Sequence, residues 1–330
     1  MANGYPWQQG LWQQLARRPQ HAHAYLLHGP SGTGKRDFAS ALADFLLCQK
    51  PQGDQPCGVC RGCLLLAAGT HPDRFELKPA EDRASVGVDQ VRELVHFVGQ
   101  TAQLAGRKLV LIAQPPVEEM TLQAANALLK SLEEPAGDTV MLLLSDQPSR
   151  VLPTVRSRCV QQAMPLPTAQ QAADYLQAVL PELAAEQRGE LLQLAAGSPL
   201  RAQQLAAQGV LEQRALVVEG VKKLLKQQIQ PTQLAEGWKD VSLLLLFDWF
   251  SQWAQLLLRY QLTGDADALG AADMHKVLQY LADKSSTPAV LHMQDWLLEQ
   301  RQKLLGKAPL NRVLLLEALL LQWARLPGSG

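Results

Sequence analysis

The sequence lacks an excess of charge of either sign. Its 330 residues include 31 Lys and Arg against 31 Asp and Glu, so the formal net charge is zero. A protein that holds nucleic acid by its backbone needs a basic surface, because every phosphate contact neutralises a negative charge. The charge balance therefore argues against a sequence-specific DNA-binding protein built around a metal.

The sequence also lacks a long apolar run. The runs that begin at Leu243 and Val313 are interrupted at Asp248 and Glu317, well short of the ~20 residues that cross a bilayer. The first residues have neither the basic start nor the apolar stretch of a signal peptide. We expect a cytoplasmic protein with no membrane partner. At 330 residues with 47% hydrophobic content, it should form two or three globular domains.

Cysteine is scarce outside one cluster. Four of the five cysteines follow the spacing C-x8-C-x2-C-x2-C, at Cys48, Cys57, Cys60 and Cys63. In a reducing compartment such clustering favours a metal over disulfides, and four thiolates suit a structural, tetrahedral Zn²⁺. A redox C-x-x-C pair is the alternative. Cys159 stands apart, and we expect it to be a small buried hydrophobic residue.

One phosphate-binding loop is present, and its last position is altered. The pattern G-x-x-x-x-G-K-[ST] uses backbone N–H groups and a lysine to hold phosphates, and a final hydroxyl to bind Mg²⁺. Here Arg36 replaces that hydroxyl, and arginine has no lone pair for a cation. The predicted nucleotide-binding residues are Gly29, Pro30, Ser31, Gly32, Thr33, Gly34, Lys35 and Arg36.

A second part of a hydrolytic site is also missing. The buried strand predicted at 108–112 should be followed by a carboxylate for Mg²⁺, but Gln114 and two prolines follow it. We expect Glu118 and Glu119, which come after these prolines, to point elsewhere. Two losses in one site argue against hydrolysis by this chain. The alternative is an ATPase that hydrolyses ATP in cis as a motor subunit.

Strand-like and helical segments alternate through the first half. Expected strands lie at 24–28, 74–77, 108–112 and 139–144. Helical apolar stripes lie between them. Their members are Phe38, Ala41, Leu42, Phe45, Leu46, then Val88, Val91, Leu94, Val95, Val98, then Leu122, Ala125, Leu128, Leu129 and Leu132. This alternation predicts an α/β fold with a parallel sheet flanked by helices.

The second half has no strand signals. After a proline-punctuated linker at 165–167, the stretch to Gln208 is predicted to be a small three-helix unit. The remainder is predicted to be all-helical. Five of the seven tryptophans fall there, at Trp238, Trp249, Trp253, Trp296 and Trp323. They indicate the core of a helical bundle, or alternatively contacts between subunits.

Two further motifs carry a family resemblance. Residues 126–135 read Asn-Ala-Leu-Leu-Lys-Ser-Leu-Glu-Glu-Pro, and residues 156–159 read Arg-Ser-Arg-Cys. With the altered phosphate loop and the cysteine cluster, they resemble the AAA+ clamp-loader subunits of bacterial replicases over essentially the whole chain. The resemblance implies an AAA+ domain at 1–166 with a zinc module at 48–63, a helical lid at 167–208 and a collar domain at 209–330.

The resemblance also implies roles. Arg158 matches an arginine finger that reaches the ATP of a neighbouring subunit, and the four clustered cysteines match a zinc module. A surface arginine paired with a carboxylate is the alternative for Arg158. Nucleotide binding stays open, because non-hydrolysing members have degenerate loops whereas this chain keeps Gly32, Gly34 and Lys35. The position of Arg201 is shifted from that of a nucleotide-sensing arginine in hydrolysing relatives.

The implied partners are the γ/τ and δ subunits of a hetero-pentameric ring, the sliding clamp and, through the complex, primed DNA. The ring belongs to the holoenzyme of a DNA-directed DNA polymerase and carries the clamp-loader ATPase activity. No catalysis is expected from the isolated chain. ATP or ADP could occupy the loop without being hydrolysed there.

Overall fold

The computed structural model describes residues 4–80, 85–104, 106–133, 137–265, 269, 273–305 and 310–328. The chain divides into two compact units, Met1–Leu205 and Ala206–Gly330. The division into three domains stays a prediction.

A parallel sheet forms the centre of the first unit. Within the described residues it has five strands in the order β2-β3-β4-β1-β5. The strands are β1 (Ala24–His28), β2 (Arg74–Glu76), β3 (Lys108–Ile112), β4 (Thr139–Ser145) and β5 (Val160–Ala163). The sequence pattern did not predict β5, because this edge strand is largely exposed and reads Val-Gln-Gln-Ala.

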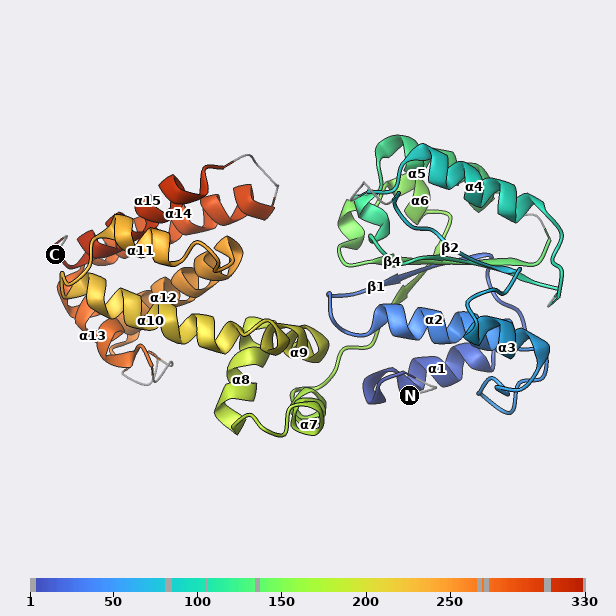
Figure 1. The fold of residues 1–330 in the computed structure, drawn as a ribbon, viewed down its shortest axis with the longest axis horizontal. Helices are drawn as coiled ribbons and strands as arrows, with labels where there is room; N and C mark the ends of the chain where they lie inside the picture. The colour runs from blue at the N-terminus through green and yellow to red at the C-terminus, as the bar shows by residue number, and fades with distance from the viewer. Residues whose placement is uncertain are drawn as a thin grey trace. The chain divides into compact units, whose positions relative to one another are not determined.

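Helices cover both faces of the sheet (Figure 1). α1 (Gln9–Ala16) and α2 (Lys35–Leu46) cover one face, and α4 (Val88–Gly99) and α5 (Leu122–Glu133) cover the other. Side chains alternate along each strand, so Leu109 packs beneath α2 while its neighbour Val110 packs beneath α4 and α5. A strand buried on both faces is mostly apolar, and β3 and β4 are apolar except at their ends, where Lys108, Thr139 and Ser145 lie.

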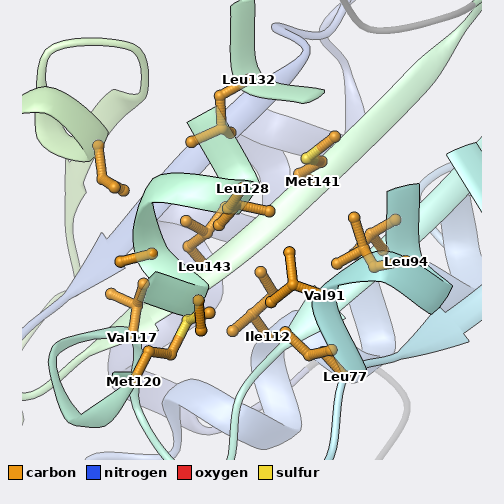
Figure 2. Close-up of a cluster of buried hydrophobic side chains, with 14 of the residues drawn as sticks. Leu77, Val91, Leu94, Ile112, Val117, Met120, Leu128, Leu132, Met141 and Leu143 are labelled. Atoms are coloured by element: carbon orange, nitrogen blue, oxygen red, sulfur yellow. The ribbon is translucent and has the colours of Figure 1, made fainter. Parts of the chain in front are cut away.

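Figure 2 shows the apolar cluster beneath α4 and α5, where Val91 and Leu94 meet Leu128 and Leu132 over the sheet. One predicted member of the α5 stripe is not buried. Leu122 is 63% exposed, because it is the first residue of the helix and precedes the turns that pack on the sheet.

Short helices join these layers. They are η1 (Pro6–Gln8), α3 (Arg61–Ala67), η2 (Val117–Glu119), η3 (Pro148–Arg150) and α6 (Pro153–Arg156). After β5, the first unit ends in helices α7 (Ala169–Val179) and α8 (Ala185–Leu194) and most of α9 (Pro199–Ala207). The three helices predicted at 168–208 are therefore present, and their forming a separate domain stays a prediction.

The second unit is helical throughout its described residues. It contains α10 (Val210–Leu225), α11 (Pro231–Gly237), α12 (Leu243–Thr263), α13 (His275–Lys284), α14 (Thr287–Leu305), α15 (Arg312–Arg325) and η5 (Leu326–Gly328). Four of its five tryptophans are buried, and Trp253 and Trp323 both pack on Phe250. These four belong to the bundle core. Among the described residues, no helix combines the length and apolar character that a membrane span requires.

Candidate functional site

The phosphate loop lies between β1 and α2, where a P-loop fold places it. Gly32 and Gly34 have left-handed φ values of +74° and +85°, a conformation that glycine adopts without strain. Lys35, 6% exposed, donates to the carbonyl oxygens of Gly29 and Pro30, each at 2.7 Å. Its Nζ also pairs with Asp146 Oδ1 at 2.6 Å. All three N–H donors of the ammonium group therefore have acceptors within the protein.

The two altered positions of the predicted magnesium site meet in space. Arg36 donates through Nη1 to Gln114 Oε1, and through Nη2 to Glu76 Oε1 at 3.2 Å. Glu76 ends β2 and Gln114 follows the adjacent strand β3, so both lie at the carboxyl edge of the sheet. A guanidinium group thus holds together the oxygens that would surround a cation in a hydrolysing site.

The two glutamates after the prolines have different surroundings. Glu118 Oε1 accepts the backbone N–H groups of Asp146 and Gln147, each at 2.8 Å. Glu119 lines a cavity of about 570 Å³ together with Arg36 and Gln114, so the residue lies beside the altered magnesium site. Glu118 in turn fixes the backbone of Asp146, the partner of Lys35.

The N-terminal segment packs on the phosphate loop. Trp7 Nε1 and Gln8 Nε2 both donate to the Thr33 carbonyl oxygen, at 3.0 and 2.9 Å. Tyr5 donates to Asp37 Oδ2 at 2.6 Å, and burial together with this carboxylate raises the pKa of the Tyr5 hydroxyl well above its usual value. The tyrosine therefore stays protonated and remains a donor. A Cβ added to Gly34 would lie 2.4 Å from the Tyr5 ring.

The helices that follow β5 also reach this loop. Ser198 Oγ donates to the Ser31 carbonyl oxygen at 2.9 Å. A Cβ added to Gly32 would lie 2.4 Å from that Oγ and 2.8 Å from the backbone nitrogen of Arg201. Helix α9 therefore begins against the loop, and both glycines are needed for close approach as well as for backbone conformation.

The four clustered cysteines come together as the spacing predicts. The Sγ atoms of Cys48, Cys57, Cys60 and Cys63 all lie within 4.8 Å of one another. Two of these separations are 4.0 Å, between Cys48 and Cys60, and 3.9 Å, between Cys57 and Cys63. Thiolates bound to tetrahedral zinc at ~2.3 Å would be about 3.8 Å apart. The cluster could therefore hold one metal ion.

Backbone N–H groups point at three of these sulfur atoms. Cys57 N lies 3.2 Å from Cys48 Sγ, Cys60 N lies 3.3 Å from Cys57 Sγ, and Cys63 N lies 3.4 Å from Cys60 Sγ. Burial opposes ionisation of Cys60, but the N–H groups of Cys63 and Gln49 lower the pKa of its thiol to about 6. These N–H groups favour the thiolate of Cys60, which is the metal-binding form, whereas burial raises the pKa of the Cys63 thiol to about 12.

Arg158 lies just after the short helix α6, and its side chain and that of the next residue, Cys159, have different surroundings. Cys159 packs against the core, where burial raises the pKa of its thiol to about 12, so it behaves as the small hydrophobic residue that we predicted. The Arg158 side chain is partly exposed instead. Its Nε donates to Glu133 Oε1 at 2.7 Å, and Nη1 donates to the Thr154 carbonyl oxygen at 2.9 Å. Glu134 and Pro135 of the same family motif lie outside the described residues.

Sequence reasoning missed three acidic residues at these sites: Glu76, Asp146 and Glu133. Asp146 had a usable signal, because it is a charged residue directly after a long buried strand. Glu76 had no such signal, and Glu133 appeared in the family motif at 126–135 without a role of its own. Their partners lie 40 and 25 residues away in the sequence and become neighbours only in the fold.

Two family models match the chain. Residues 7–168 match the model described as "DNA polymerase III, delta subunit", and residues 208–325 match "DNA polymerase III, delta subunit, C terminal". Among curated proteins, the DNA polymerase III subunit delta' of Pseudomonas aeruginosa is 64% identical over 330 residues and covers 100% of both chains. That of Yersinia pestis is 34% identical over 337 residues, covering 99% of this chain and 97% of its own length.

Among solved structures, a gamma subunit-related protein of DNA polymerase III from Thermotoga maritima aligns with a TM-score of 0.47 and 20% identity. The alignment covers 97% of this chain and 99% of that one. Family assignment rests on the full-length sequence relationships. The chain belongs to the DNA polymerase III subunit delta' family, the delta prime subunits of the AAA+ clamp loader.

Proposed function

We propose that this chain is a non-hydrolysing clamp-loader subunit that supplies Arg158 in trans to ATP bound by a neighbouring subunit. It would assemble with γ/τ and δ subunits in a hetero-pentameric ring and help to load the sliding clamp onto primed DNA. The observation that carries the proposal is the pairing of Arg36 with Gln114 and Glu76, where a hydrolysing subunit would hold magnesium.

The state of Lys35 supports the absence of hydrolysis in cis. A catalytic lysine of this loop must reach the β and γ phosphates, but here its three donors are held by Gly29, Pro30 and Asp146. A nucleotide would have to compete with these contacts and find its metal elsewhere. ATP or ADP binding by the loop residues 29–36 therefore stays a proposal separate from catalysis.

The exposure of the Arg158 side chain and its ordered backbone support the proposed action of this arginine in trans. Its side chain is 33% exposed, so partner atoms can approach it, and its backbone follows an ordered helix whose Val155 is buried. An arginine finger stabilises charge on the transferred phosphoryl group and is worth ~10³ to 10⁵ in rate. Arg158 is at a place in the fold where such a group can be presented outward.

The C-terminal unit, which we propose as the collar, has apolar surface for assembly. Leu291 and Leu298 on α14 are 49% and 42% exposed, and Leu314 and Leu321 on α15 are 63% and 42% exposed. Each pair is separated by seven residues, which places both members on one face of their helix. Apolar stripes of this kind suit helix packing between subunits.

We propose Zn²⁺ as the ion of the cysteine cluster, because four sulfur ligands at tetrahedral separation leave no open coordination position. The ion would hold the loop between α2 and β2 and would take no part in ATP chemistry.

The test is a ring reconstituted from this chain with γ/τ and δ subunits, in which Arg158→Ala is compared with Arg156→Ala. Arg156 is a suitable control because it lies on the adjacent short helix and donates to the Pro148 carbonyl oxygen of its own fold. Arg158→Ala should slow DNA-stimulated ATP turnover and clamp loading while the ring still assembles. Arg156→Ala should retain the parental rates. Parental clamp loading by the Arg158→Ala ring would refute the proposal.

A further inference from the structure

The guanidinium group of Arg158 is held by two separate elements. Glu133, the last residue of α5, accepts from Nε at 2.7 Å and also pairs with Nη2 through the same Oε1 atom. The Thr154 carbonyl oxygen of α6 accepts from Nη1 at 2.9 Å, and the Ser157 hydroxyl donates to the same carbonyl at 3.2 Å. The plane of the guanidinium group is therefore defined by contacts with both helices.

These contacts use only part of the hydrogen-bonding capacity of the Arg158 guanidinium group. A guanidinium group has five N–H donors, and Glu133 and Thr154 engage one on each of the three nitrogen atoms. Two donors remain, one on Nη1 and one on Nη2. Such a pair of donors can hold two oxygens of one phosphate. The contacts with Glu133 and Thr154 therefore orient the Arg158 side chain and leave two of its N–H donors for a ligand.

The position of Glu133 is unfavourable for its own helix. A carboxylate at a helix C-terminus opposes the macrodipole, whose negative end lies there. The ion pair also adds little to stability, because Glu133 is 49% exposed and Arg158 is 33% exposed. Since neither helix formation nor pairing energy explains this residue well, its contact with Arg158 points to a role in the function of that arginine.

We propose that Glu133 is a positioning residue that pre-orients Arg158 toward the phosphates of the neighbouring subunit's ATP. This inference rests on the proposed function of Arg158 as a finger in trans. Helix α5 is anchored by Leu128 and Leu132 on the sheet, so Glu133 gives the arginine a rigid support. A long side chain that is already oriented loses less conformational entropy when it engages its target.

The experiment compares Glu133→Ala, Glu133→Gln and Arg158→Ala in the reconstituted ring. Glu93→Ala serves as control, because Glu93 is an exposed glutamate on the adjacent helix α4. Glu133→Ala should reduce the turnover contributed by the adjacent site about 10-fold, less than the ~10²-fold that a 1 Å misplacement can cost. The loss should appear in kcat and not in the KM for ATP, because the finger acts in the transition state. Glu133→Gln keeps an acceptor oxygen and should recover most of the rate.

The double variant Glu133→Ala with Arg158→Ala should be no slower than Arg158→Ala alone, since the glutamate acts through the arginine. Additive losses, or a melting temperature of the free subunit that falls in parallel with the rate, would mean a structural role and overturn the inference. Parental or faster turnover by Glu133→Ala, with Arg158→Ala slow, would also overturn it and leave the finger standing. Parental turnover by Arg158→Ala would instead remove the proposed function itself.

Discussion

Arg36 donates a hydrogen bond from Nη1 to the side-chain oxygen of Gln114. These are the positions where a hydrolysing P-loop protein has a hydroxyl and a carboxylate around one magnesium ion. The two substitutions therefore complement each other. The guanidinium group of Arg36 supplies the positive charge in place of the metal ion, and the side-chain oxygen of Gln114 accepts a hydrogen bond from it. Glu76 completes the arrangement from the adjacent strand.

The first prediction concerns magnesium. Any ATP or ADP binding by the isolated chain should change little when Mg²⁺ is replaced by EDTA, because the metal ligands are absent. The double variant Arg36→Thr with Gln114→Asp should gain magnesium dependence, whereas Arg36→Thr alone should not. Isothermal titration calorimetry with and without Mg²⁺ measures this. Strong magnesium dependence in the parental chain would contradict it.

Lys35 should matter for stability more than for ring activity. Lys35→Ala removes a buried partner from Gly29, Pro30 and Asp146, and should lower the free energy of unfolding by about 1–3 kcal/mol. Clamp loading by the assembled ring should be nearly unchanged. Thermal denaturation and ATPase assays test the two parts, with the exposed Lys78→Ala as control. A large loss of ring turnover with assembly intact would instead indicate that this loop hydrolyses ATP, as in a motor subunit.

The close packing of α9 on the loop can be tested at Gly32. Gly32→Ala places a methyl group against Ser198 and Arg201 at a left-handed φ of +74°. Gly53→Ala has a similar φ of +63° but meets nothing within 4 Å. The first variant should lose roughly 1–3 kcal/mol more stability than the second, the usual cost of overpacking. Chemical denaturation of both variants gives the difference, and equal losses would show that the contact with α9 is absent in solution.

The cysteine cluster should carry one zinc ion per chain after purification under reducing conditions. Cys60→Ser should weaken binding and unfold the segment at 49–64, because metal-binding energy at such sites is folding energy. Cys159→Ser, outside the cluster, should keep the zinc. Elemental analysis and hydrogen exchange across the loop provide the readouts. Freshly purified parental protein without zinc would disprove the assignment.

Arg158→Lys should rescue little of the activity that Arg158→Ala loses in the ring. Lysine offers a point charge on one nitrogen and lacks the planar fork whose separate edges can face Glu133 and two phosphate oxygens. Both variants should melt close to the parental temperature, because a partly exposed ion pair adds little to stability. Full clamp loading by the lysine variant would show that charge alone is enough.

Periodicity in the sequence was sufficient for most elements of the first unit. The strands predicted at 24–28 and 108–112 match β1 and β3, because a strand buried on both faces has a mostly apolar run of residues. The edge strand β5 was not predictable, since an exposed strand has no such constraint. The cysteine cluster was predictable because its four ligands lie within 16 residues, so local chain geometry brings them together.

By itself, the sequence determined the parallel α/β layout, the helical second half, the metal-type cysteine spacing and the loss of the magnesium ligands. These properties depend on residue type and on spacing over one or two elements. Only the tertiary structure decided what replaces the lost ligands and what holds the arginine: Arg36 with Gln114 and Glu76, Lys35 with Asp146, and Arg158 with Glu133. Each of these contacts joins residues at least 25 positions apart. Strand order and helix packing bring them together, and no local pattern in the chain encodes that proximity.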